Sequence, residues 1–160
     1  MSTIERVLLL RRVPPFSALP PRDLGALAAV TSEHRYGDGA VLARQGEPGH
    51  ELHVVVSGAV RVLTRGPGGD VEVARRAAGE IVGEMALVTR EPRSATLVAA
   101  GDVRTLRLGR AEFDSVLRER PETAIEVIQL LSRRLAHLTG GGQLNRASAA
   151  RQAVGSERGS

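Results

Sequence analysis

The chain has 160 residues, of which 42% are hydrophobic and 25% charged, a composition that favours one soluble globular domain and excludes a disordered or membrane-spanning chain. It contains no cysteine, which excludes disulfides, thiol catalysis and cysteine-ligated metals. The net charge is +4, but all 22 basic residues are arginines dispersed among 18 acidic residues, which is the pattern of a solvated surface rather than of a nucleic-acid footprint.

The N-terminal part is predicted to be a helical lead-in over residues 3–31. The segment MSTIERVLLLRR has charges around a short apolar run and no small-residue cleavage site, so it is not typical of a signal peptide, and a cytoplasmic location without a membrane span is expected. Helical spacing predicts one helix that ends before Pro14, and LPPRDLGALAAV predicts a second. The expected buried faces are Ile4, Val7, Leu8 and Leu10 in the first helix, and Leu24, Leu27 and Ala28 in the second.

Residues 36–108 are predicted to form short strands, because turn residues recur about every eight to twelve positions. LHVVVSGAVRVLT predicts a hairpin around Ser57-Gly58, and Gly101-Asp102 is interpreted as another turn. The alternation in VRTLRL, over 103–108, predicts a half-buried strand. The predicted fold class is therefore α+β, a small antiparallel β-barrel of the jelly-roll type with helices before and after it.

Residues 110–139 predict two closing helices that pack against the barrel. The first brings Phe113, Val116 and Leu117 together, and the second begins at Pro121. The apolar stripe of the second helix is Ile125, Ile128, Leu131, Leu135 and Leu138. The polar, small residues over 140–160 predict a flexible tail, so residues 1–139 are expected to form the domain.

One segment of the barrel region, GEIVGEMALVTREPRSATLVAA (79–100), places charged residues among apolar ones. A charge buried alone is costly, so Glu84 and Arg93 are expected to meet a partner, which can be a ligand. GEMALV predicts a short helix whose N-terminal amides favour an anion, and Gly83 allows a close backbone approach. Arg93 supplies a guanidinium fork that suits two phosphate oxygens, and Ser94 adds a hydroxyl donor.

Glu84 suits a sugar better than a phosphate. A carboxylate beside an anion is repulsive, but it is a good acceptor for a ribose 2′-hydroxyl, so the segment predicts a small phosphorylated sugar as ligand. The structural alternative is an internal ion pair between Glu84 and Arg93 that closes the loop.

The same segment resembles the phosphate-binding cassette of the cyclic nucleotide-binding domain family, which includes bacterial catabolite activator proteins, regulatory subunits of cyclic AMP-dependent kinase and cyclic nucleotide-gated channels. The resemblance covers roughly residues 4–139. VPPFSALPPRDLGALA resembles the family's first helices, YGDGAVLARQGEPGHELHVVVSGAVRVL its first strands, and FDSVLRERPETAIEVIQLLSRRLAHL its closing helices.

The resemblance implies a role for each cassette residue. Glu84 binds the ribose 2′-hydroxyl, and Arg93 with Ser94 binds the cyclic phosphate. The other ligand-binding positions, which act through backbone amides or shape the cassette helix, are Gly83, Ala86, Leu87 and Ala95. Val82 departs from the family, which usually has phenylalanine there, and this predicts looser packing behind the cassette.

The position of the base is implied by the last helix, which usually caps the base in the family. The implied base lid is Leu135, Leu138 and Thr139. None of the three aromatic residues is predicted to stack on a purine; they are Phe16, Tyr36 and Phe113. Ser94 favours cyclic AMP as the ligand, and cyclic GMP is the alternative, because a hydroxyl at this place also suits cyclic GMP.

Three other functions are weighed against this interpretation. GHELHVVVSGAV suggests a metal-dependent cupin-like enzyme, but His50 and His53 would lie on opposite faces of a strand and the other ligands are missing, so no metal site and no cofactor are predicted. Direct DNA binding is not expected, because the 21 residues after Thr139 begin with three glycines and lack an amphipathic period. A degenerate domain that serves protein interaction only is the third alternative.

The predicted function is that of a regulatory module without catalysis of its own, which binds a cyclic nucleotide and changes conformation on binding. Arg93 is expected to anchor the ligand while the cassette and the helix over 121–138 rearrange and the lid closes over the base. The effector protein or domain is not identified by the sequence. The apolar stripes of the first and last helices leave a homo-oligomer open.

Overall fold

The computed structural model describes residues 1–141, apart from the side chains of Val88 and of residues 137–141. The tail predicted over 140–160 lies outside the described residues from 142 onward. The elements, in chain order, are α1 (Thr3–Leu10), the 3-10 turn η1 (Phe16–Ala18), α2 (Pro21–Val30), β1 (Ser32–Tyr36), β2 (Val41–Ala43), β3 (Glu51–Gly66), β4 (Gly69–Ala77), β5 (Ile81–Val82), α3 (Met85–Val88), β6 (Thr96–Gly109), α4 (Arg110–Glu119) and α5 (Pro121–Gly141).

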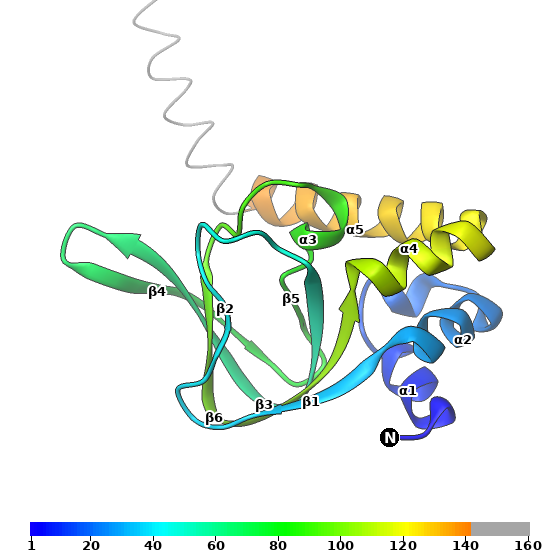
Figure 1. Cartoon of the computed structure of the whole chain (residues 1–160), viewed down its shortest axis with the longest axis horizontal. Helices are drawn as coiled ribbons and strands as arrows, with labels where there is room; N and C mark the ends of the chain where they lie inside the picture. The colour runs from blue at the N-terminus through cyan, green and yellow to red at the C-terminus, as the bar shows by residue number, and fades with distance from the viewer. Residues whose placement is uncertain (142–160) are drawn as a thin grey trace, which may run out of the picture.

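The strands form one antiparallel sheet in the order β1-β6-β3-β4, with β2 paired to β6 and β5 paired to β3. The α+β jelly-roll class is confirmed, although the two edge strands β1 and β4 do not pair, so the sheet is rolled rather than closed. In Figure 1, α1, α2 and α4 lie on one side of the roll, α5 and α3 lie along its top, and the β3–β4 hairpin projects away on the opposite side. β1 begins at Ser32, before the strand region predicted from residue 36. The sequence SEHRY is too polar to indicate a strand, so this part of β1 was not predicted.

Two hydrophobic clusters hold the fold together, one on each face of the rolled sheet. The outer face packs on α1, α2, α4 and α5 through side chains that include Leu52, Val54, Leu106 and Leu108. The inner face fills the roll with Leu42, Val55, Val60, Val82, Leu97, Ala99 and Val103. Because successive strand residues point to opposite faces, the long strands β3 and β6 contribute to both clusters. Each fully buried leucine or valine stabilises the fold by about 1.5–3 kcal/mol.

The predicted hairpin around Ser57-Gly58 is wrong, and so is the turn at Gly101-Asp102. Both pairs lie inside the long antiparallel strands β3 and β6, where the pairing register shifts between Ser57 and Ala59. Gly58 and Gly101 have φ angles of 84° and 73°, which bend the strands rather than reverse them. A Cβ on Gly58 would lie 2.2 Å from the carbonyl oxygen of Asp102, so glycine here permits the two strands to curl together.

The helices bury faces that differ in part from the prediction. Leu24, Leu27 and Ala28 of α2 are buried as predicted. Four apolar side chains of the other helices are instead 41% to 73% exposed: Ile4, Leu8, Leu117 and Ile125. In α5 the buried side chains are Ala124, Val127 and Leu131, of which only Leu131 belongs to the predicted apolar stripe. The small side chain of Ala124 lets the helix approach the core closely, so the helix packs through this face rather than through Ile125.

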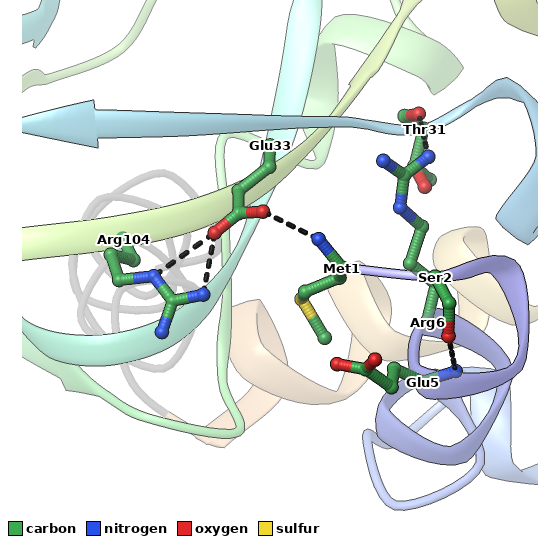
Figure 2. A network of polar contacts seen from close by, with 7 residues as sticks. All are labelled: Met1, Ser2, Glu5, Arg6, Thr31, Glu33 and Arg104. Carbon is green, nitrogen blue, oxygen red and sulfur yellow. Dashed lines mark hydrogen bonds and ion pairs between the residues drawn. The ribbon is translucent and has the colours of Figure 1, made fainter.

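Glu33 on β1 joins the N-terminus to the sheet (Figure 2). Its Oε2 accepts from the α-amino group of Met1 at 2.9 Å, and its Oε1 accepts from Nε of Arg104 at 3.0 Å. Arg6 of α1 donates to the backbone oxygen of Thr31 at 2.8 Å in the same corner. Since Arg104 lies on β6, this network fastens the N-terminal helices to the edge of the sheet.

We expect Glu33 to make folding stability depend on pH in the acid range. Hydrogen bonds from Arg104 and then from the α-amino group lower its pKa from 4.5 to about 2. A carboxyl with a lowered folded-state pKa contributes stability above its unfolded pKa, and that contribution is lost as the pH falls through the folded pKa. The thermal midpoint should therefore fall between pH 4.5 and pH 2, and it should fall less in a Glu33→Gln variant. Parallel midpoint curves for the two proteins, measured by circular dichroism, would contradict this assignment.

Candidate functional site

The cassette segment leaves β5, turns at Gly83 and forms the single-turn helix α3. Gly83 has a φ of 75°, a left-handed conformation that favours glycine. Glu84 is the N-cap of α3, and its side chain makes no capping hydrogen bond there. Its carboxylate therefore serves another partner. The chain then returns through residues 90–95 to the start of β6.

Arg93 lies across the backbone of two neighbouring segments. Its Nη2 donates to the carbonyl oxygen of Glu51 at 2.9 Å, and its Nη1 donates to that of Gly83 at 3.5 Å. Its stem packs on Gly49, where an added Cβ would lie 3.0 Å from Nε. Burial lowers the pKa of Arg93 from its ordinary value, and the charge of Glu51 opposes this shift. Because the ordinary value of an arginine is so high, the group stays cationic at neutral pH.

Arg93 and Glu84 do not pair with each other, so the alternative of an internal ion pair between them is wrong. Glu84 is 9% exposed, and its Oε1 accepts from Nε of Arg134 on α5 at 3.3 Å. Among the side chains that the structure describes, no carboxylate forms an ion pair with Arg93. The two hydrogen bonds of the Arg93 guanidinium are to neutral carbonyl groups and use two of its five N–H donors. The site thus presents a partly buried cation that suits an anionic ligand.

A cavity of about 460 Å³ opens beside these groups, within the size range of small-molecule sites. Arg93, Ser94 and Glu84 lie in its wall, together with Arg76 of β4. The rest of the lining is largely apolar and contains no aromatic residue: Val62, Val73, Ala74, Ile81, Val82, Met85, Ala95, Leu97 and Leu135, with Gly83. A wall of this kind suits a ligand that carries a phosphate, a hydroxyl-bearing sugar and an apolar ring.

Most of the residues singled out in the sequence meet at this cavity. Those in its lining are Gly83, Glu84, Arg93, Ser94, Ala95 and Leu135. Ala86 and Leu87 lie behind it with 4% and 5% exposure, and the Ala86 amide donates to the carbonyl of Gly83. The side chains of Leu138 and Thr139 lie outside the described residues.

Several groups that shape the site were not predicted from the sequence. Gly49 and Glu51 come from GEPGHE, where the glycine turn was visible but the contact to Arg93 was not. Arg134 belongs to an arginine pair that looks like surface charge. At Val73 the strand β4 has an extra residue relative to β3, so that Val73 and Ala74 both line the cavity. No sequence signal marks this bulge.

The structure also places the histidines of the metal alternative. His50 is exposed, whereas His53 is buried within the roll and its Nδ1 lies 3.0 Å from Oγ1 of Thr105. Burial lowers the pKa of His53, which favours the neutral ring, and the nearby Glu51 opposes the shift. Among the residues whose side chains the structure describes, no group of three or more histidine, aspartate or glutamate residues is arranged to hold a metal ion.

The fold is a jelly roll, and the segment from Gly83 to Ala95 lines a cavity whose cationic and hydroxyl groups suit a phosphorylated ligand. The family model of the cyclic nucleotide-binding domain matches residues 33–120. The chain belongs to the cyclic nucleotide-binding domain family, as its cassette predicts.

Three known proteins illustrate the relationship. A cyclic nucleotide-gated potassium channel of Mesorhizobium japonicum is 40% identical over 116 residues, which are 72% of this chain and 31% of the channel. The cyclic AMP receptor protein of Thermus thermophilus is 33% identical over 123 residues, which are 76% of this chain and 57% of that protein. The regulatory domain of Toxoplasma gondii PKA, crystallised with cAMP, has a TM-score of 0.72 at 26% identity and matches 84% of this chain and 50% of that one.

The matched region covers 57% of the Thermus receptor protein and 22% of a cAMP-dependent protein kinase regulatory subunit of Hypocrea atroviridis, so the chain spans only part of the length of these curated relatives. Those relatives carry further segments that have no counterpart in the matched region. Within residues 1–141, no helix combines the length and the apolar character needed to span a membrane.

Proposed function

We propose that this chain is a regulatory module that binds a cyclic nucleotide, cyclic AMP in preference to cyclic GMP, and transmits the binding to a partner. The observation that carries the proposal is the partly buried guanidinium of Arg93, which is held by two carbonyl groups at the edge of the cavity. The N–H groups of Arg93 that do not bind these carbonyls can donate to an anion, and the two carbonyl contacts fix the orientation of the guanidinium.

The phosphate is placed at the end of the cavity where Arg93 and Ser94 meet. The hydroxyl of Ser94 makes only a weak contact, at 3.9 Å, to the sulfur of Met85, so it can turn to donate to a phosphate oxygen. The guanidinium supplies the full charge that the hydroxyl lacks. Ala95 lies beside both groups in the lining, where its small side chain leaves room for the phosphate.

The ribose is placed against Glu84. Only Oε1 of this carboxylate takes part in the contact to Arg134, and a carboxylate has lone pairs on both oxygens, so Oε2 is the acceptor for the 2′-hydroxyl. The same carboxylate then contacts the ligand and α5. This connection supports a population shift in which the nucleotide biases the position of α5 relative to the cassette.

The base is placed on the apolar wall formed by Val62, Val73 and Leu97, with Leu135 of α5 above it. The predicted lid residues Leu138 and Thr139 follow on the same helix. The preference for cyclic AMP rests on Ser94 and on the cyclic AMP-binding relatives, a receptor protein and a kinase regulatory domain. No catalytic step is proposed. The partner is a protein or domain that contacts α5 and responds to its change of position.

Isothermal titration with cyclic AMP and cyclic GMP tests the proposal, with 5′-AMP as the control ligand. We expect cyclic AMP to bind with a micromolar or better Kd, which corresponds to about 8 kcal/mol, and cyclic GMP to bind more weakly. Solution mass measured with and without ligand shows whether a homo-oligomer forms. No heat with either cyclic nucleotide would favour a degenerate interaction module and overturn the proposal.

The role of Glu84 is tested with a ligand that lacks the 2′-hydroxyl. A hydrogen bond to a charged group contributes about 1.5–3 kcal/mol, so we expect 2′-deoxy cyclic AMP to bind at least about tenfold more weakly than cyclic AMP. In Glu84→Ala the two ligands should bind with equal affinity, whereas Glu91→Ala, an exposed change near the cassette, should keep the difference. A discrimination that survives in Glu84→Ala would assign the hydroxyl to another residue.

A further inference from the structure

We infer that Arg110, the first residue of α4, is a positioning residue for the nucleotide site: it holds the C-terminal end of the cassette helix α3 and couples that helix to α4. The inference rests on the proposed function, because it concerns the affinity of the same site. Neither the cassette motif nor the cavity lining includes this residue.

The cassette helix needs support from outside its own four residues. A single turn leaves its last carbonyl groups without partners within the helix, and a helix this short is marginal in isolation. The guanidinium of Arg110 donates through Nη2 to the carbonyl oxygens of Ala86 and Thr89, the second at 2.9 Å. A cation at this end of a helix also opposes the negative end of its dipole.

Arg110 is anchored in turn next to the carbonyl group of Glu51, which holds Arg93. Its backbone N–H donates to the carbonyl oxygen of His50 at 2.6 Å, and the next carbonyl, that of Glu51, accepts from Nη2 of Arg93. The backbone of Arg110 and the side chain of Arg93 therefore bind adjacent carbonyl groups where β3 begins. Arg93 fixes the start of the cassette through Gly83, and Arg110 fixes its end.

The position of Arg110 in the chain gives this contact a regulatory consequence. β6 leaves the cassette at Thr96 and runs into α4 without a loop, since β6 ends at Gly109 and α4 begins at Arg110. α4 packs on α5, which contributes Leu135 to the cavity lining and contacts Glu84 through Arg134. A displacement of the cassette end is thus passed by Arg110 to the helices that close the site.

The experiment measures cyclic AMP affinity by titration and backbone hydrogen exchange in the parent, Arg110→Ala and Arg118→Ala. Arg118 is an exposed arginine on the same helix and serves as the matched control. We expect Arg110→Ala to bind about tenfold more weakly, the effect of losing a charge-assisted hydrogen bond. Amide protection should fall in the cassette around 85–89 and not in β3 or β6, and saturating cyclic AMP should restore it. Arg118→Ala should match the parent.

Arg110→Lys keeps the inference testable if the alanine variant does not fold, because lysine keeps the charge but carries a compact, strongly hydrated ammonium on a more flexible stem, which is less well placed than Nη2 of Arg110 to contact both carbonyl groups. Its affinity and its cassette protection should both lie between those of the parent and of the alanine variant. Parent-like affinity in either variant would overturn the inference, and so would a loss of protection that is uniform over the sheet, which marks a purely structural role. Absence of binding in the parent itself would instead contradict the proposed function.

Discussion

Replacing Arg93 with alanine is expected to weaken cyclic AMP binding by about thirtyfold to several thousandfold, because removing one partner of a buried charge pair costs about 2–5 kcal/mol. The fold should survive, since Arg93 contributes only two hydrogen bonds to carbonyl groups that lie at the edge of the cavity. Titration calorimetry gives the affinity, and circular dichroism with thermal melting gives the fold and its stability.

Arg90→Ala is the matched control for this change. Arg90 is an exposed arginine of the same loop, so its removal changes the net charge equally without touching the cavity. Arg93→Lys should fall between the parent and Arg93→Ala, because an ammonium keeps the charge but cannot offer two parallel donors. If Arg93→Ala and Arg90→Ala bind cyclic AMP with the parent's affinity, the phosphate lies elsewhere.

The second large effect is expected for Gly83→Ala. A Cβ at this position would lie 2.5 Å from Nη1 of Arg93 and 3.2 Å from the carbonyl oxygen of Glu51. The guanidinium is the far end of a flexible side chain, so it can move away, but it then leaves the place from which it serves the ligand. We expect cyclic AMP affinity to fall on the order of tenfold or more, as when the fork geometry is lost.

The control for Gly83→Ala is Gly79→Ala. Gly79 also has a left-handed φ, 88°, but nothing lies within 4 Å of its added Cβ. Both variants should lose about 1–2 kcal/mol of stability from backbone strain, which lowers the thermal midpoint by about 2–8 °C. Only Gly83→Ala should lose affinity. Equal losses of affinity in both variants would show that strain, and not displacement of Arg93, is responsible.

The cassette was readable in the sequence because its chemistry is local. Gly83, Glu84, Arg93 and Ser94 lie within twelve positions of one another, and each residue type has a limited set of uses when placed among apolar neighbours. The same locality made α2 predictable, since its prolines, acidic first turn and apolar face are all adjacent in the chain. Family membership followed from the order of these local signals.

Contacts between segments that are distant in the chain could not be predicted from the sequence. The arginine pair that includes Arg134 has the composition of a solvated surface, yet α5 brings Arg134 to Glu84, fifty positions earlier. Arg110 has no local signal at all, because its partners are carbonyl groups, which every residue carries. Turns were wrongly predicted at Gly58 and Gly101, where a left-handed φ bends the long strands β3 and β6 rather than ending them.

The amino-acid sequence was sufficient to predict the class of the fold, the family and the residues proposed to bind a phosphorylated sugar, because these depend on hydrophobic period and on the chemistry of one short segment. Three features depend instead on contacts in the folded molecule: Glu84 pairs with Arg134 rather than with Arg93, two backbone carbonyls hold the guanidinium, and α5 faces the core through Ala124, Val127 and Leu131. The physical reason is that these choices are made by packing: several partners are equally compatible with the local sequence, and the close approach of distant segments selects one of them.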